Sequence, residues 1–322
     1  MENSANESWR ICQAIMHEVN KVIIGKPEAV KLLTLALISG GHVLIEDVPG
    51  VGKTTIAAAL AKATGLEYKR IQLTPDVMAS DITGFSAYDK SIGEFKYNPG
   101  VVMTNILIAD EINRTSPKTQ SALLEAMEEK QVTVDGVTRK LSQPFMVIAT
   151  ENPLGFVGTY PLPEAQLDRF LLKFVIGYPQ CSDEIKIITD RKKENPLDNV
   201  KAVVSAQEIL NVQKEVNDIY VDEDICEYIV NLIQATRTNK DIVLAASPRA
   251  SIALIKASSA NALINGRNYV TPGDVSEMFG YVVGHRIILS AEAKLERITN
   301  AQMLTSILNS IKAPVLKRKK EI

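Results

Sequence analysis

The chain has 322 residues, of which 46% are hydrophobic and 23% are charged, and its formal net charge is −2. This composition is typical of a folded protein of about two domains, and the small net charge favours neither nucleic acid nor an anionic membrane as a partner. The three cysteines, Cys12, Cys181 and Cys226, are far apart, which argues against a zinc site and a disulfide framework. No apolar run reaches the ~18 residues of a membrane span, so we expect a cytoplasmic protein.

The first elements expected along the chain are helices at residues 8–20 and 27–39, followed by a short buried strand at residues 42–45. Residues 47–54 then read Asp-Val-Pro-Gly-Val-Gly-Lys-Thr, and a helix pattern covers residues 55–62. A strand, a glycine-bearing turn and a helix together favour binding of a polyphosphate, because the N–H groups of the turn and the helix N-terminus carry partial positive charge.

The residue types of this P-loop each have a chemical reason. Gly50 and Gly52 remove side chains that would block the phosphates, Lys53 can reach the β- and γ-phosphates, and the hydroxyl of Thr54 can ligate Mg²⁺. The general pattern has glycine at the position of Asp47, so the match is one residue short. The residues expected to contact the nucleotide are Asp47, Val48, Pro49, Gly50, Val51, Gly52, Lys53, Thr54 and Thr55.

Further strands are expected at residues 68–73, 106–109, 145–149 and 171–176, and a helix capped by Ser116 at residues 117–129. Strands that alternate with helices predict an α/β fold with a mainly parallel five-stranded sheet covered on both faces. Two segments interrupt this rhythm. Residues 74–100 form a long insertion, and residues 131–141 are typical of a hairpin that turns at Asp135-Gly136.

Strand ends supply the candidates for hydrolytic chemistry. Asp110 follows the apolar residues 106–109, where a carboxylate on a strand beside the P-loop strand would hold Mg²⁺, and Glu111 could polarise the attacking water. Asn152 follows the fourth strand and could position that water, although asparagine before proline is also common in turns.

Two arginines could supply positive charge to a γ-phosphate. Arg169 could reach the nucleotide of a neighbouring subunit, although an Asp-Arg pair such as Asp168-Arg169 is often a local salt bridge. Arg249 lies in the expected first turn of a helix, where a cation opposes the helix dipole. A purely structural residue would not explain this small cost well, so Arg249 could meet a phosphate.

The strand pattern fades after residue 179. The remaining helices are expected at residues 183–193, 206–216, 223–236, 248–265, 273–284 and 295–311. The sequence therefore predicts two domains, an α/β nucleotide-binding domain at residues 1–180 and a small all-helical lid domain at residues 181–322.

Together these segments resemble the MoxR family of AAA+ ATPases, which usually carries an acid at the position of Asp47. The resemblance covers about residues 20–290 and is carried by residues 46–54, 110–114, 117–127, 152–153, 160–170 and 247–249. It implies the following roles: Lys53 and Thr54 for Walker A, Asp110 and Glu111 for Walker B, Asn152 for sensor 1, Arg169 for the arginine finger, Arg249 for sensor 2, Ile24 and Gly25 for the adenine-lining segment, residues 74–100 for the helix-2 insert, residues 131–141 for the pre-sensor-1 hairpin, and Arg114 for a contact with a neighbouring subunit.

The resemblance also implies a function. Family members form hexameric rings that hydrolyse ATP with Mg²⁺ and are thought to act as chaperones, which remodel a client protein complex or assist metal insertion with a separate von Willebrand factor A domain protein. Two alternatives stay open. An AAA+ motor or activator on nucleic acid is disfavoured because no Gly-Ala-Phe-Thr-Gly-Ala loop and no helix-turn-helix module is visible, and a nucleotide-binding switch without turnover is disfavoured because every expected catalytic residue is present.

Overall fold

The computed structural model describes residues 2–48, 50–91, 93–152, 158–191 and 196–315. Contacts divide the chain into two compact units: residues 11–211 form the first, and residues 1–10 together with 212–322 form the second. By this grouping residues 181–211 belong with the first unit, and the domain boundary expected at residue 180 stays a prediction.

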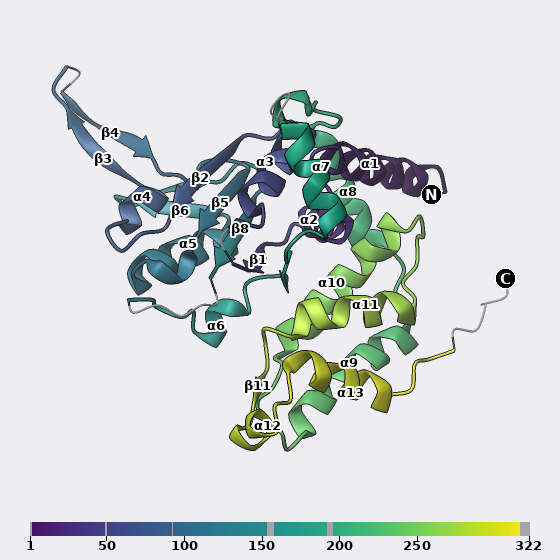
Figure 1. The fold of residues 1–322 in the computed structure, drawn as a ribbon. Helices are drawn as coiled ribbons and strands as arrows, with labels where there is room; N and C mark the ends of the chain where they lie inside the picture. Colours follow the sequence, from purple (N-terminus) through teal and green to yellow (C-terminus); the bar gives the residue numbers. More distant parts are fainter. Residues whose placement is uncertain (1, 49, 92, 153–157, 192–195, 316–322) are drawn as a thin grey trace. The chain divides into compact units, whose positions relative to one another are not determined.

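The first unit is built on a five-stranded parallel sheet with the strand order β2-β5-β8-β1-β9 (Figure 1). The strands are β1 (Val43–Glu46), β2 (Tyr68–Gln72), β5 (Ile106–Asp110), β8 (Met146–Glu151) and β9 (Leu172–Phe174). The predicted α/β fold with five parallel strands is therefore confirmed. Parallel strands bring their carboxyl ends to one edge, which is where open α/β sheets bind ligands.

One expectation about the sheet was wrong. The strand that ends in Asp110 does not lie beside the P-loop strand, because β8 lies between β5 and β1. The register still brings the ends of these strands together, since Glu46 of β1 is level with Glu151 of β8, and Ala109 of β5 is level with Ala149. The periodicity of a sequence predicts strands but not their order, so this error could not be seen from the pattern alone.

The first unit also contains helices and 3₁₀ turns. They are α1 (Glu2–Asn20, from residue 11 onward), α2 (Pro27–Ile38), α3 (Lys53–Thr64), α5 (Pro117–Glu129), α6 (Glu164–Leu167), α7 (Cys181–Arg191), the start of α8 (Ala206–Asp218), and the 3₁₀ turns η1 (Ile112–Arg114) and η2 (Pro196–Asn199). The hydroxyl of Ser116 accepts a hydrogen bond from the Thr119 N–H at 3.3 Å, which confirms the predicted cap of α5. Leu123 and Leu124 of α5 share a buried apolar cluster with Leu107 of β5, and this packing fixes the strand that ends in Asp110.

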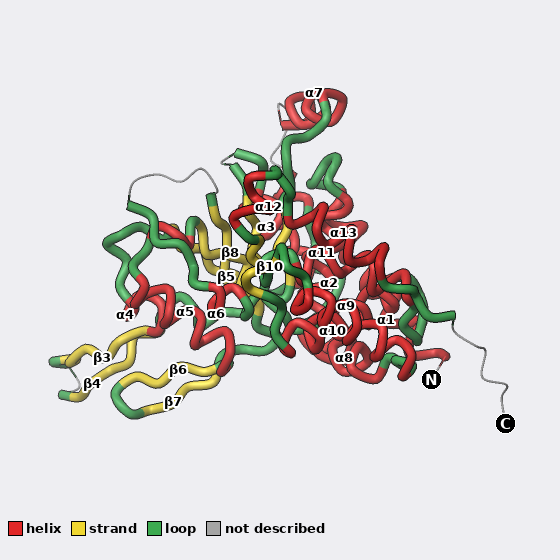
Figure 2. The backbone as a smooth tube through the Cα atoms, turned by 90° about the horizontal axis from the view of Figure 1, so that it is seen from below, coloured by secondary structure: helices red, strands yellow, loops and turns green. Residues whose placement is uncertain are grey.

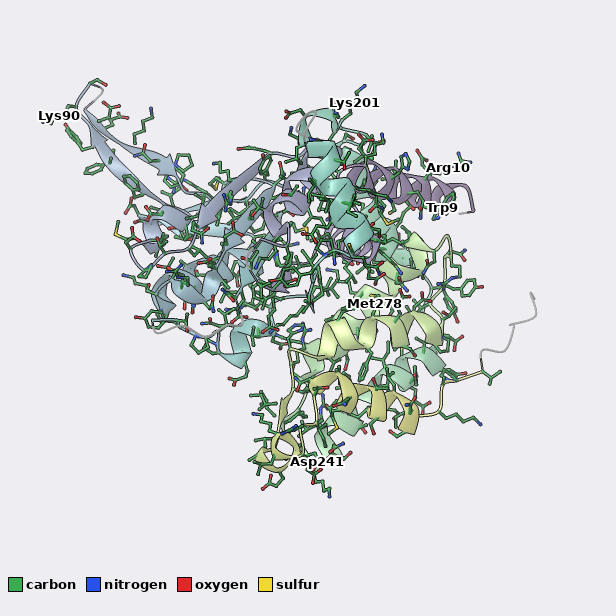
Figure 3. All side chains as sticks on the ribbon, in the orientation of Figure 1. Trp9, Arg10, Lys90, Lys201, Asp241 and Met278 are labelled. Atoms are coloured by element: carbon green, nitrogen blue, oxygen red, sulfur yellow. The ribbon has the colours of Figure 1, made fainter. Side chains whose placement is uncertain are left out.

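Two hairpins extend from this unit, and Figure 2 shows both as pairs of yellow strands. The insertion contains α4 (Ala79–Thr83) and the antiparallel strands β3 (Gly84–Asp89) and β4 (Glu94–Pro99), with Lys90 in the connection at the far end (Figure 3). The second hairpin pairs β6 (Gln131–Val134) with β7 (Val137–Lys140). Its turn residues have φ values of 53° at Asp135 and 74° at Gly136, which confirms the predicted hairpin and fits a type I′ turn.

The second unit is mainly helical. Its elements are the end of α8, α9 (Glu223–Thr238), α10 (Pro248–Ile264), α11 (Pro272–Val283), α12 (Ala291–Leu295) and α13 (Asn300–Ser310). A short antiparallel pair, β10 (Ile242–Leu244) with β11 (Ile288–Leu289), adds to the predicted helices. Strands of two and three residues are too short to produce an alternating pattern, so the sequence gives no signal for them.

Within the described part of the chain, no helix has both the length and the apolar character required to cross a membrane.

Candidate functional site

The P-loop connects the end of β1 to the start of α3. Gly50 and Gly52 both have φ of 92°, in the left-handed region that side chains rarely adopt. A Cβ atom at either position would meet no other atom within 4 Å, so the backbone conformation, and not crowding within the chain, requires glycine there. Among the described residues no side chain caps the N-terminus of α3 at Gly52. The N–H groups there could therefore donate hydrogen bonds to an anion. Pro49, also expected to contact the nucleotide, lies outside the described residues.

Lys53 begins α3 and points back across the loop. Its Nζ donates a hydrogen bond to the backbone oxygen of Asp47 at 2.6 Å. Burial lowers the pKa of Lys53, while the carboxylates of Asp47, Asp110 and Glu111 act in the opposite direction. A polyphosphate in the loop would add further negative charge and favour the ammonium form.

Thr54 meets Asp110 across the sheet edge. The Thr54 hydroxyl donates to Oδ2 of Asp110 at 3.4 Å, and the Thr150 hydroxyl donates to Oδ1 at 3.2 Å. Nε of Arg70, on β2, also donates to Oδ2 at 2.7 Å. A hydroxyl and a carboxylate at this separation are the hard oxygen ligands that Mg²⁺ takes from a protein when phosphates and water complete its shell, so this pair fits that ion.

Glu111 directly follows β5 and has φ of 57° and ψ of 52°. A residue other than glycine in this conformation costs about 1–3 kcal/mol and persists only where the surroundings hold it. Its N–H donates to the Thr150 hydroxyl at 3.0 Å, and its carboxylate accepts from Arg114 at 2.8 Å. These two contacts fix the backbone and the carboxylate of Glu111, which directly follows Asp110 at the edge of the sheet.

Asn152 lies half-buried just after β8, and its backbone oxygen accepts a hydrogen bond from Asn113 at 3.3 Å. This contact joins the end of β8 to η1, which follows Glu111. The structure therefore brings Lys53, Thr54, Asp110, Glu111 and Asn152 to one edge of the sheet.

The two candidate arginines have other surroundings. Nε of Arg169 donates to Glu128 of α5 at 2.7 Å, so Arg169 makes a salt bridge within its own chain. Arg249 is exposed in the first turn of α10, in the second unit. The expectation that each meets a nucleotide stays a prediction.

An apolar pocket borders the P-loop inside the first unit. Its lining includes Ile24, Ile56, Ile176 and Ile187, together with Val51 and Gly52 of the loop. Gly25 has φ of 74°, and a Cβ atom there would lie 2.2 Å from Oδ2 of Asp183, so only glycine lets α7 approach the segment that carries Ile24. An apolar slot that opens beside a phosphate-binding loop has the chemistry that a planar base requires.

Comparison with known proteins agrees with this arrangement. The ATPase family associated with various cellular activities (AAA) matches residues 42–172, and an AAA lid domain matches residues 234–307. Chaperone MoxR1 of Mycobacterium tuberculosis is 38% identical over 97% of this chain and 85% of its own length. The chain belongs to the MoxR family of AAA+ ATPases.

Other relatives extend along most of the chain. Protein YeaC of Bacillus subtilis is 48% identical over 94% of each chain, and Protein MoxR of Methylorubrum extorquens is 27% identical over 94% of each chain. A crystal structure of an ATPase candidate from Cytophaga hutchinsonii superposes with a TM-score of 0.91, at 37% identity and over 98% of each chain.

Sequence reasoning missed two residues of this MoxR-family site. Arg70 bonds the carboxylate of Asp110, and Thr150 bridges Asp110 to the N–H of Glu111. Thr150 is the residue before the last of β8, and parallel strands end at the same edge, which is the signal that could have found it. Arg70 is the central residue of β2, level with Ile108 and two residues before the partner of Asp110, so only the pairing of β2 with β5 indicates it. The signal was weak because strand order, which decides the neighbours, was not known.

Proposed function

We propose that this MoxR-family chain hydrolyses ATP at the P-loop, with Mg²⁺, and acts in an oligomeric ring as a chaperone-like remodelling or maturation factor for a protein complex. One observation carries the proposal of hydrolysis: the Thr54 hydroxyl lies 3.4 Å from Asp110, which puts the two expected metal ligands in contact beside Lys53. The strained backbone of Glu111, next to this pair, supports a catalytic role for its carboxylate.

The proposed chemistry assigns each residue one task. The P-loop N–H groups bind the β- and γ-phosphates. Lys53 binds them as well, after its hydrogen bond to the backbone oxygen of Asp47 breaks. Thr54 and Asp110 would hold Mg²⁺, which when bound neutralises charge on the phosphate oxygens. Glu111 orients the attacking water and accepts its proton, and Asn152 helps to position that water.

The apolar pocket is the proposed site of the adenine base. Its apolar walls suit a planar ring, and its lining includes Val51 and Gly52, so the pocket adjoins the phosphate loop. Ile24 and Gly25 belong to this proposal because one lines the pocket and the other sets its shape.

The ring is proposed from family membership and from the arginines. Arg169 would act as an arginine finger on the next subunit after its bond to Glu128 opens, and Arg249 would act as sensor 2. The proposal also includes a hexamer, a separate von Willebrand factor A domain partner, a client protein complex, a role in metal insertion and a cytoplasmic location. One relative is named a chaperone, which supports the remodelling role.

The test of hydrolysis is steady-state phosphate release. We expect Glu111→Gln to lower turnover about 10²–10⁴-fold, the usual contribution of a positioned acid–base group, while ATP binding persists. Glu125→Gln, at an exposed position of α5, is the matched control and should leave turnover unchanged. Wild-type protein that binds ATP without releasing phosphate would favour the nucleotide-binding switch.

Arg169→Ala tests the ring. An arginine finger contributes ~10³–10⁵ in rate, or about 4–7 kcal/mol, so turnover should nearly vanish while ATP binding stays intact. Because the finger serves the neighbouring site, mixing Arg169→Ala with Glu111→Gln should restore part of the activity that each lacks alone. Glu128→Gln controls for the salt bridge. An equal loss in Glu128→Gln, with no recovery on mixing, would reduce Arg169 to a structural residue.

A further inference from the structure

Asp47 joins the P-loop to the chain segment that leaves β9. It is buried, and its Oδ2 accepts hydrogen bonds from the N–H groups of Ile176 at 2.8 Å and Gly177 at 2.6 Å. Its Oδ1 accepts from the N–H of Val48 at 2.8 Å, and its backbone oxygen accepts from Lys53. One residue therefore contacts both the phosphate loop and the segment after β9.

Lys26 holds the same segment through its carbonyl groups. Nζ of Lys26 donates to the backbone oxygen of Ile176 at 2.8 Å and to that of Tyr178 at 2.6 Å. Both Lys26 and Ile176 line the apolar pocket. The N–H and the C=O of Ile176 are thus bonded to opposite charges, while Ile176 forms part of the pocket wall.

Only a carboxylate satisfies these contacts at position 47. The three N–H groups approach both oxygens, so both must be acceptors. An asparagine has one acceptor oxygen, and in either orientation its NH₂ group would face a backbone N–H. Asp47 is not among the described residues with positive φ, so its backbone does not require the glycine of the general P-loop pattern.

We propose that Asp47 is a positioning residue that couples the base pocket to the phosphate loop. A ligand that orders Ile176 from the pocket also orders the Asp47 carboxylate, and through it Val48 and the carbonyl that Lys53 contacts. A phosphate that binds Lys53 would remove the hydrogen bond from Lys53 to the backbone oxygen of Asp47, and so would act on Asp47 from the phosphate loop. The inference rests on the proposed function, since it assumes that the base and phosphates of one nucleotide occupy these two places.

Fragments of the nucleotide test the coupling. Binding of adenosine and of pyrophosphate, each with and without the other and with Mg²⁺, is measured by calorimetry. In the wild type we expect each fragment to strengthen the other at least about fivefold, the lower range of measured couplings. Asp47→Asn should bring this factor close to one, whereas a merely structural role would weaken both fragments and leave the factor unchanged, which would overturn the proposal.

A second variant covers the case in which Asp47→Asn does not fold. Lys26→Met keeps Asp47 but releases the carbonyls of Ile176 and Tyr178, so the coupling factor should also fall. Full coupling in this variant would count against the proposal. If the wild type releases phosphate from ATP but its coupling factor is close to one, the coupling fails while the proposed function stands. If it binds neither ATP nor the fragments, both fail.

Amide hydrogen exchange without ligand separates the contacts of Asp47 from nucleotide binding. Because bonds to a charged acceptor are strong, we expect the Ile176 and Gly177 amides to exchange at least about tenfold faster in Asp47→Asn than in the wild type. Asp222→Asn, which alters a carboxylate that accepts a backbone N–H at the start of α9, is the matched control and should leave these amides unchanged. Equal exchange in wild type and Asp47→Asn would overturn the role of Asp47 whether or not the chain binds nucleotide.

Discussion

Two buried aspartates, one in each unit, each accept hydrogen bonds from an arginine and from threonine hydroxyls, but the number and the length of their bonds differ. Asp274 of α11 is 2% exposed and accepts from Arg267 twice, at 2.6 Å each, and from the N–H of Thr271 at 2.8 Å. It also accepts from Asn261 at 2.9 Å. Asp110 is 5% exposed and accepts one short bond, from Arg70 at 2.7 Å, and two longer bonds from hydroxyl groups.

The difference separates a structural carboxylate from one with chemistry to perform. Around Asp274 a forked arginine and a helix cap use both oxygens with short bonds, so no acceptor site is left for a ligand. Around Asp110 the hydroxyls of Thr54 and Thr150 are weakly held. The partner arginines differ in the same sense, because the Arg70 side chain is 52% exposed and the Arg267 side chain is 26% exposed. Burial and charge alone do not distinguish the two; the number and length of the bonds do.

The largest effect is expected for Asp274→Asn on the stability of the second unit. Removing one partner of a buried ion pair leaves the other charge uncompensated, and we expect a loss of about 3 kcal/mol in the free energy of unfolding, near the lower limit because Arg267 reaches solvent. The single tryptophan, Trp9, packs beside Gly266 in this unit, so its fluorescence in urea reports the loss. Figure 3 labels Trp9 on α1. A change below about 1 kcal/mol would contradict the structural role.

The same carboxylate makes the stability of the second unit depend on pH. Burial acts to raise the pKa of Asp274, but hydrogen bonds from Arg267 and Thr271 outweigh it and the pKa is lowered. Its stabilising contribution is therefore present above the unfolded pKa of about 3.9 and is lost as the pH falls through the folded value. Urea midpoints of the wild type should fall below about pH 4, and those of Asp274→Asn should fall less. Parallel curves would exclude Asp274 as the source.

In contrast to Asp274→Asn, we expect Asp110→Asn to reduce activity and to leave stability nearly unchanged. The amide lacks the charge that a metal requires, so we expect ATP turnover to fall about 10–100-fold, or about 1.4–2.7 kcal/mol, with an increased requirement for Mg²⁺. The unfolding of the first unit, followed by circular dichroism, should change by less than about 1 kcal/mol, because Arg70 can remain solvated after losing its partner. If Asp110→Asn unfolded the first unit but kept its ATP turnover, Asp110 would be a structural carboxylate, and its contrast with Asp274 would not hold.

The sequence predicted the parts of this site that lie on continuous segments. The P-loop, the end of β5 and the hairpin at residues 131–140 each depend on local chemistry, namely glycine, an apolar run before an acid, and Asp-Gly in a turn. These signals can be read from one sequence because the residues that produce them are neighbours along the chain. The five strands and the cap of α5 were predictable for the same reason.

The parts that were missed depend on which strands are neighbours. Arg70 reaches Asp110 only because β2 pairs with β5, and Thr150 bridges Asp110 and Glu111 only because β8 lies on the other side of β5. The motif alone shows Asp47 as a departure from the P-loop pattern, because its partners Ile176 and Gly177 are 129 and 130 residues away in the sequence. Long-range pairing of this kind leaves no periodic pattern, so the sequence alone could not predict it.

The smallest predicted effect concerns Arg70 and sharpens the comparison. A cation 2.7 Å from Asp110 opposes a second cation at the same carboxylate, so Arg70→Gln should lower the Mg²⁺ concentration needed for nucleotide binding about two- to fivefold, or ~0.4–1 kcal/mol. Binding of a fluorescent ADP analogue over a Mg²⁺ titration measures this without requiring turnover. Arg70→Lys keeps the charge and should behave like the wild type, and Arg267→Gln should leave the titration unchanged while it destabilises the second unit. If Arg70→Gln instead needed more Mg²⁺, Arg70 would be holding Asp110 in its binding orientation, and the pair at Asp110 would be as structural as the pair at Asp274.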